Sequence, residues 1–206
     1  MGVSETEAAA LFQQEAAEHA RLVESVRRDL ADDLARMHEM WVDCVSGGGK
    51  ILLFGNGGSA SQAQHIALEL AVRLKINRPA IAGLSLASDA SLLTAAANDM
   101  GFEQVFARQI EALGRPGDLA LGISTSGRSA NVNAGVSAAR TLGLKTAAMT
   151  GGDGGRLAGL VDHAIIVPST STVRIQEIHL LLGHTLCASL ERHLLAGQRP
   201  SSLAQG

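Results

Sequence analysis

The segment Ile51-Leu-Leu-Phe-Gly-Asn-Gly-Gly-Ser-Ala60 decides the fold. It starts with four apolar residues in a row, which is typical of a strand that is buried on both faces in a parallel sheet. A glycine-rich turn follows, and a helical stretch opens at Ser59. A strand, a tight turn and a helix in this order form the repeating unit of α/β folds.

Further apolar runs follow the first one, and most of them also lead through a turn into a helical stretch. They cover residues 80–86, 119–123, 146–149 and 163–167. We therefore expect one α/β domain with a doubly wound sheet of about five parallel strands, flanked by helices. In such a sheet, ligands bind at the carboxyl ends of the strands. The turns after the strands are therefore where we look for function.

The chain starts with a long helical region, residues 1–46. Proline is absent from it, and apolar residues recur at steps of three and four along its second half. The members of this stripe are Val23, Val26, Leu30, Leu34, Met37, Trp41 and Cys44. The pattern predicts an amphipathic helix that breaks once near residues 18–21 and ends at Gly47-Gly-Gly49. Since one small sheet does not require so long a stripe, we expect the region to pack on the domain and in an oligomer.

Residues 47–197 are expected to form the core of the domain, so the chain has one domain overall. The last helix of this core is predicted from Val173 to about Leu195, with Gly183 as its only glycine. One face of it carries Ile175, Ile178, Leu182, Leu186 and Leu190. The remaining residues, 198–206, are expected to be a frayed tail.

The composition excludes several classes of protein. Acidic residues outnumber basic ones by three and aromatic residues make up 2% of the chain, so neither a basic surface nor stacking platforms for nucleic acid are expected. No uncharged apolar run approaches the ~20 residues of a membrane span, and the acidic start is unlike a signal peptide. Cys44 and Cys187 are too few for a disulfide framework and are expected in the core. We expect a cytoplasmic protein that binds neither nucleic acid nor membrane.

The turn from Gly55 to Ala60 has the features of a phosphate-binding loop. Glycines let backbone N–H groups approach an anion, and the helix that opens at Ser59 adds the positive end of its dipole. The turn also matches the dinucleotide pattern G-x-G-x-x-A, but that site needs an acid about 20 residues further on. The nearest candidate, Asp89, lies 34 residues beyond Gly55. A tight turn without a ligand is the other alternative.

A second turn, Ser124-Thr-Ser-Gly-Arg-Ser129, follows the run 119–123 and precedes a helical stretch. Four hydroxyl groups and a glycine at a helix start can donate to a phosphate from side chains and backbone together. An ordinary helix cap with surplus hydroxyls is the alternative. Arg128 either adds positive charge or is solvated. Two such turns at neighbouring strand ends favour a phosphate site.

Two helical segments carry candidate acid/base residues or metal ligands. His65 and Glu69 are four residues apart, about 40° around a helix and hence on one face, which suits a shared metal ion or proton transfer. A surface pair is the alternative. The last helix offers Gln176, Glu177, His179 and His184, and its periodicity does not choose between the two histidines. If the two segments meet beside the phosphate turns, the chemistry is that of a phosphorylated sugar.

Several motifs along almost the whole chain together resemble a known family. They are Gly55-Asn-Gly-Gly-Ser-Ala60, Gln64-His65 with Glu69, Asn98-Asp99-x-Gly101-Phe102, Ser124-Thr-Ser-Gly127, and Ile175-Gln176-Glu177-x-His179 with His184. This set resembles the sugar isomerase (SIS) domain family, and within it the bacterial phosphoheptose isomerases. The chain departs from the usual pattern at Ala87-Ser88-Asp89, Met100 and Ala130, which affects loop geometry only.

The resemblance implies an aldose–ketose isomerase that converts sedoheptulose 7-phosphate to D-glycero-D-manno-heptose 7-phosphate, the first step of nucleotide-activated heptose synthesis for lipopolysaccharide or another surface glycan. It implies Glu69 and His184 as catalytic residues, and His65, Glu69, Gln176 and His184 as ligands of one zinc ion per subunit. The implied substrate-binding residues are Asn56, Gly57, Gly58, Ser59, Arg73, Asn98, Asp99, Ser124, Thr125, Ser126, Ser129, Thr172 and Gln176. It also implies a homotetramer with active sites at subunit interfaces.

The alternative within the same family is a protein without catalysis. It would bind a sugar phosphate or a protein partner such as a replication initiator, and would act as a regulator. Such relatives are expected to lose the glutamate or the second histidine, whereas this chain has both Glu69 and His184.

Overall fold

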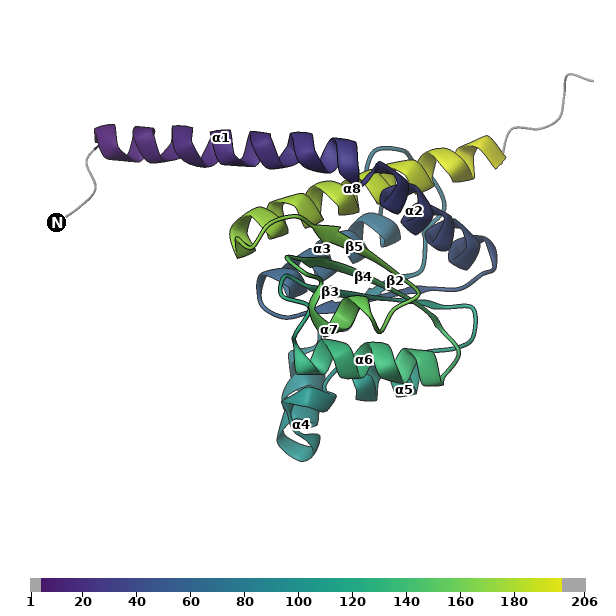
Figure 1. Ribbon diagram of the computed structural model, residues 1–206. Coiled ribbons are helices and arrows are strands. Elements are labelled where there is room, and N and C mark those ends of the chain that lie inside the picture. Colours follow the sequence, from purple (N-terminus) through teal and green to yellow (C-terminus); the bar gives the residue numbers. More distant parts are fainter. Residues whose placement is uncertain (1–4, 198–206) are drawn as a thin grey trace, which may run out of the picture.

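The protein, seen here in a computed structural model that describes residues 5–197, contains one five-stranded parallel sheet (Figure 1). The strands are β1 (Ile51–Gly55), β2 (Gly83–Ser85), β3 (Leu119–Ser124), β4 (Lys145–Gly151) and β5 (His163–Val167). Their order is β2-β1-β3-β4-β5. The predicted fold class is confirmed. Only β2 is much shorter than the apolar run that predicted it, since its pairing with β1 begins at Gly83.

Helices cover both faces of the sheet. One face is covered by α2 (Ala31–Ser46), α3 (Gly58–Ala71) and α8 (Thr172–Gly197), and the other by α4 (Ala90–Met100), α5 (Ala107–Leu113), α6 (Ala130–Thr141) and α7 (Gly155–Ala158). A short 3-10 turn, η1 (Phe102–Gln104), links α4 to α5. Along β1, Leu53 faces the first group of helices and Phe54 the second. Every residue of β1 and β3 is buried, as predicted from their continuous apolar runs.

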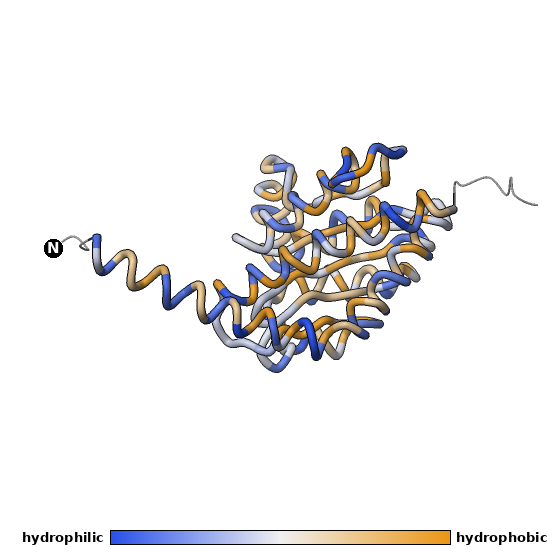
Figure 2. The backbone as a smooth tube through the Cα atoms, turned by 90° about the horizontal axis from the view of Figure 1, so that it is seen from above, coloured by the Kyte–Doolittle hydropathy of each residue, from blue (hydrophilic) through white to orange (hydrophobic). Residues whose placement is uncertain are grey.

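The amino-terminal helical region is confirmed, but its break lies elsewhere than predicted. The helix α1 (Glu5–Asp29) is separated from α2 by the single residue Leu30. Val26 is the only buried residue of α1, whereas Met37 and Trp41 of α2 are fully buried. The bend therefore comes where the helix starts to pack on the domain, and α1 projects away from the body (Figure 2).

The last helix and the core cysteines agree with the sequence. The helix α8 covers the predicted span, and the five apolar residues of its predicted stripe are all buried. Burial raises the pKa of the Cys44 thiol to about 11 and that of the Cys187 thiol to about 12, so both remain protonated and apolar. The predicted tail, 198–206, lies outside the described residues. Among the helices of residues 5–197, none combines the length and the apolar character that crossing a bilayer requires.

The topology places both candidate phosphate turns together. Strands β1 and β3 are neighbours, with Gly55 opposite Ile123. The chain leaves β1 into α3 on one face of the sheet and leaves β3 into α6 on the other face. This is the switch point at which doubly wound sheets bind ligands.

Candidate active site

The turn after β1 lies directly against the turn after β3. Asn56 Nδ2 donates to Asn131 Oδ1, and Asn131 Nδ2 donates back to Asn56 Oδ1, both at 2.8 Å. Gly57 has a φ of 54°, which favours glycine, and a Cβ at Gly55 would lie 2.5 Å from the Ile123 carbonyl oxygen. The amide pair thus fixes the turn after β1 to the first turn of α6, directly after the turn that follows β3. Sequence reasoning missed Asn131, because its burial and its pairing with Asn56 depend on tertiary contacts.

The turn after β3 presents its hydroxyl groups at the start of α6. Ser129 is the N-cap residue of α6, and its Oγ lies 3.1 Å from Ser124 Oγ. Ser126 is exposed and Thr125 is half-buried. Backbone N–H groups in the first turn of α6 lack helical partners and carry the positive end of the dipole. Hydroxyl donors and a helix start therefore converge as an anion site requires.

Arg128, on the same turn, forms an ion pair with Asp153 in the loop after β4. Its Nη1 donates to Asp153 Oδ1 at 3.0 Å, and its Nη2 donates to Oδ2 at 2.6 Å. The hydrogen bonds from Arg128 lower the pKa of the Asp153 carboxyl to about 2. Both side chains are exposed, so the pair is screened by water. Arg128 is thus both exposed to solvent and paired with Asp153.

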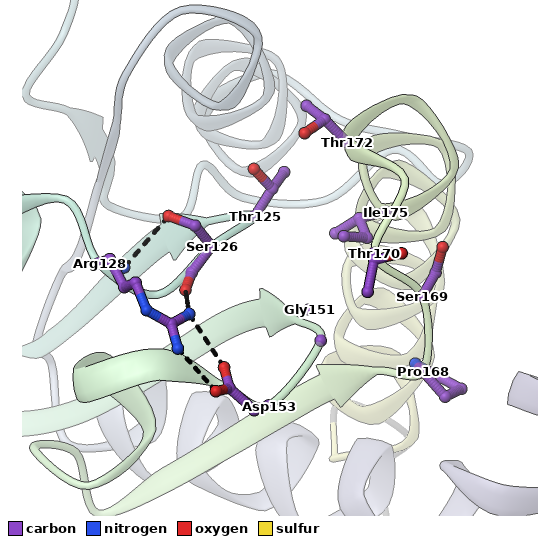
Figure 3. A pocket seen from close by; sticks show the side chains of 11 residues that line it. Thr125, Ser126, Arg128, Gly151, Asp153, Pro168, Ser169, Thr170, Thr172 and Ile175 are labelled. Atoms are coloured by element: carbon purple, nitrogen blue, oxygen red, sulfur yellow. Dashed lines mark hydrogen bonds and ion pairs between the residues drawn. The ribbon is translucent and has the colours of Figure 1, made fainter.

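An open cavity of about 820 Å³ lies beside these hydroxyl groups (Figure 3). Its wall is formed by Thr125 and Ser126 from the turn after β3, by Gly151 at the end of β4, and by Thr172 and Ile175 at the start of α8. The structure therefore brings Thr172 to the same cavity as the hydroxyl turn. A volume of this size accommodates a small metabolite.

The second part of the site joins α3 to α8. His65 Nε2 lies 2.8 Å from His184 Nε2 and 3.6 Å from Glu69 Oε1. One potential ligand atom from each of the three residues lies within 4.8 Å of the other two. The Glu69 side chain is 12% exposed, while His65 and His184 are half-buried. The two segments predicted to carry acid/base residues therefore do meet.

Gly183 lies at the contact between α3 and α8. A Cβ at Gly183, the residue before His184, would lie 2.7 Å from Ile66 Cδ1. Real Cβ atoms do not come that close to a neighbour, so a larger residue here would require the Ile66 side chain to shift. The only glycine expected within the last helix thus packs tightly against Ile66 of α3, next to His65 in the sequence.

The structure also distinguishes the two histidines of α8. His179 is fully buried, and its Nε2 lies 3.1 Å from the Thr150 carbonyl oxygen in β4. Burial lowers the pKa of His179 to about 4, although the hydrogen bond with Thr150 acts in the opposite direction. His179 is a core histidine, whereas His184 faces His65 and Glu69.

The three grouped residues fit a divalent metal ion. Two imidazole nitrogens and one carboxylate oxygen are a ligand set of catalytic zinc sites, which leave a fourth position open. Gln176, the predicted fourth ligand, lies against the first turn of α3, where a Cβ at Gly58 would be 2.3 Å from its Nε2. Its backbone carbonyl accepts a hydrogen bond from Gln62 Nε2. Gln176 is thus held at α3, the helix that also carries His65.

Three predicted substrate-binding residues are not brought to these groups within the chain. Arg73 is exposed just beyond the end of α3. Asn98 and Asp99 are exposed near the end of α4, on the opposite face of the sheet from α3. Asn98 donates to Asp99, and within residues 5–197 no hydrogen bond or ion pair joins any of the three to the turns or to His184.

Comparisons with known proteins agree with this geometry. A family model described as the SIS domain matches residues 16–151, a span that contains both turns together with His65 and Glu69. A phosphoheptose isomerase of Paramagnetospirillum magneticum is 50% identical over 183 residues, which cover 89% of this chain and 95% of the relative. The chain belongs to the phosphoheptose isomerase family of SIS domain proteins.

Solved structures of family members extend the agreement to the three-dimensional fold. The phosphoheptose isomerase of Neisseria gonorrhoeae superimposes with a TM-score of 0.85 at 40% identity, covering 89% of this chain and 98% of that chain. The one from Francisella tularensis superimposes with a TM-score of 0.87 at 34% identity, covering 90% and 98% of the two chains. The fold of this chain therefore matches that of its solved relatives over nearly their whole length.

Proposed function

We propose that this protein is an aldose–ketose isomerase that interconverts sedoheptulose 7-phosphate and D-glycero-D-manno-heptose 7-phosphate. The reaction would be the first step of nucleotide-activated heptose synthesis. One observation carries the proposal: Glu69 of α3 and His184 of α8 converge beside His65. The same chain has the hydroxyl-rich turn 124–129 and belongs to the phosphoheptose isomerase family.

The substrate phosphate is assigned to the two turns at the switch point. Ser59, Ser124, Thr125, Ser126 and Ser129 supply hydroxyl groups, and the starts of α3 and α6 supply backbone N–H groups. Asn56, Gly57, Gly58 and Thr172 are assigned to the walls around the sugar, together with Gln176. Holding the far end of the substrate in this way would align the reacting carbons with α3 and α8.

The chemical step moves a proton between C1 and C2 through an enediol, so it needs a base at carbon and an acid at oxygen. We assign the carbon proton to Glu69, because a largely enclosed carboxylate is a suitable base for a carbon acid. We assign the oxygen protons to His184, whose Nε2 is in hydrogen-bonding distance of His65 Nε2. In the absence of a metal ion, this contact with His65 would fix the ring orientation and tautomer of His184.

The same residues would hold one zinc ion per subunit, with His65, Glu69 and His184 as ligands and Gln176 as the fourth. This assignment rests on the chemistry of the donor set and on the grouping of the three residues. A bound zinc ion would supply Lewis-acid stabilisation of negative charge on the substrate oxygens.

We also propose that the enzyme is a homotetramer that acts in the cytoplasm. The projecting helix α1 exposes 55% of Leu11 and 67% of Phe12, which is an apolar surface suited to a neighbouring subunit (Figure 2). A second subunit could also supply Arg73, Asn98 and Asp99 to a site that they do not reach within their own chain. Both points remain predictions.

The test is an assay of the purified protein with sedoheptulose 7-phosphate, with and without a chelator. We expect formation of the aldose phosphate, loss of the activity with the chelator, and recovery when zinc is added. Sedoheptulose without its phosphate is the control and should react far more slowly. Light scattering on the same sample should give the mass of four chains of 21.3 kDa. No product in either condition would overturn the isomerase and favour the alternative, a sugar-phosphate-binding regulator.

A further inference from the structure

A buried ion pair joins α8 to the segment that follows α3, and α3 and α8 are the two helices that meet at the candidate active site. Arg78, in the segment after α3, places its Nε 3.4 Å from Glu191 Oε1 of α8. The two side chains are 1% and 0% exposed. Neither residue was singled out from the sequence, and neither belongs to the catalytic, metal or substrate-binding sets above.

Arg78 caps the end of α3 at the main chain of Glu69. Its Nη2 donates to the Glu69 carbonyl oxygen at 2.7 Å, and its Nη1 donates to the Leu70 carbonyl oxygen at 2.8 Å. These carbonyl groups belong to the last turn of α3, where intrahelical partners run out, and this turn carries no basic residue of its own. The guanidinium group therefore holds the turn that carries the proposed carbon base.

Glu191 holds the adjoining segment from the other side. Its carboxylate accepts hydrogen bonds from the backbone N–H groups of Leu74, Lys75 and Ile76, at 2.8, 3.0 and 3.1 Å. These bonds and the charge of Arg78 lower the pKa of Glu191, although burial acts in the opposite direction and is the largest single influence. The bonded segment starts directly after Arg73, so Glu191 also fixes the place where that side chain leaves the backbone.

The position of Glu191 along α8 links this anchor to the site. Glu191 follows His184 by seven residues, which is about two helical turns and brings both to the same side of the helix. Glu191 and His184 of α8 thus both face the α3 layer, one with Arg78 and the other with His65. A displacement of the anchor would change the separation of Glu69 from His184.

Stability alone does not account for such a pair. A buried ion pair loses most of its attraction to desolvation, and well-packed apolar residues are often as stable in its place. What apolar residues would not supply is the set of directed bonds to the main chain of Glu69 and to the segment after Arg73.

We propose that Arg78 and Glu191 are positioning residues, which hold Glu69 and Arg73 at a fixed separation from His184. The inference rests on the proposed isomerase function. A misplacement of about 1 Å at a reacting group can cost about 100-fold in rate. The pair can therefore affect kcat even though its hydrogen bonds to α3 and to the segment after it involve main-chain atoms only.

The chain contains a matched control at the other end of the sheet. Asp118, 4% exposed, accepts hydrogen bonds from the backbone N–H groups of Lys50 and Arg115 at 2.9 and 2.8 Å. It also pairs with the Lys50 ammonium group. Lys50 and Asp118 directly precede β1 and β3, so they lie at the amino ends of the strands, away from the site. Asp118→Asn therefore disrupts a comparable anchor without touching α3 or α8.

The experiment compares Glu191→Gln, Arg78→Lys and Asp118→Asn at a temperature at which circular dichroism shows each variant to be folded. We expect kcat to fall at least 10-fold in Glu191→Gln and Arg78→Lys, while the inhibition constant of inorganic phosphate changes less than about twofold, because the phosphate turns are untouched. Asp118→Asn should keep kcat within about twofold of the wild type, even if its melting temperature falls as far as those of the other two variants. A loss that only followed global stability would affect all three variants alike.

Two further measurements test the proposal even if one variant does not fold. If Glu191→Gln does not fold, Arg78→Lys decides, because it keeps the buried positive charge and loses the fork to Glu69 and Leu70. A crystal structure of Arg78→Lys should show the Glu69 carboxylate displaced from His184, beyond the 4.8 Å grouping of the wild type. An unchanged geometry, or kcat within twofold of wild type, would overturn the positioning role. Failure of the proposed function would instead appear as absent turnover in the wild type.

Discussion

His179 and His184 lie five residues apart on α8 and have opposite surroundings. His179 points into the sheet layer, is fully buried, and bonds to the carbonyl of Thr150. His184 is half-buried and faces His65 across the gap to α3. Five residues rotate a side chain by about 140° around a helix, so one histidine meets the sheet and the other meets α3.

This difference shows that the surroundings of a histidine decide whether it can take part in catalysis. Burial lowers the pKa of His179 to about 4, so it stays neutral near pH 7 and serves as a hydrogen-bonding core residue. His184 has a carboxylate and a second imidazole within reach, together with access to solvent. Proton transfer requires that combination of accessibility and partners.

The largest expected contrast is in turnover. His184→Gln should lower kcat by about 10²- to 10⁴-fold, the range that a general acid or base contributes. His179→Gln removes the same chemical group five residues away and should keep kcat within about threefold, with a lower melting temperature. Steady-state kinetics and thermal unfolding of both variants test this. An equally large loss of kcat in folded His179→Gln would contradict the division between the two faces of α8.

A smaller effect is expected in the pH dependence of stability. The folded protein keeps His179 neutral down to about pH 4, whereas unfolded chains protonate histidine near pH 6.5, so the unfolded state binds more protons between these values. The contribution of His179 to the free energy of unfolding should therefore fall as the pH is lowered from 6.5 to 4, by about 3 kcal/mol in total.

Urea unfolding at pH 7 and pH 5 measures this contribution, of which about 2 kcal/mol should be lost at pH 5. His179→Gln lacks the titrating group, so its stability should decline less than that of the wild type over the same interval. Parallel declines in the two proteins would show that His179 is not the group responsible.

Much of the fold could be predicted from local pattern, and the errors come from tertiary contacts. The strands β1 and β3 follow from uninterrupted apolar runs, because strands buried on both faces have no polar positions. The run 80–86 is longer, but only Gly83–Ser85 pair with β1. The helix break was predicted near residues 18–21 and occurs at Leu30, because it depends on where the domain begins to support the helix.

The candidate site likewise combines local features, which the sequence predicts, with features that depend on tertiary contacts. The turns and the His65–Glu69 spacing are local features, so the sequence alone identified them. Helical spacing could not choose between the two histidines of α8, because the choice depends on which neighbour each one meets. The anchor residues Arg78 and Glu191 were missed, because their partners are main-chain atoms far away in sequence. The one local signal was an acid, Glu191, directly after Leu190 of the apolar stripe, and Arg78 had none.

Glu69 is the residue proposed to move a proton at carbon during isomerisation. The most direct test is solvent exchange, in which wild type and Glu69→Gln are incubated with sedoheptulose 7-phosphate in D₂O and deuterium at C1 and C2 is followed by NMR. The wild type should introduce deuterium at these carbons, and Glu69→Gln should introduce none while binding inorganic phosphate as the wild type does. Deuterium exchange by Glu69→Gln at the wild-type rate would contradict the assignment.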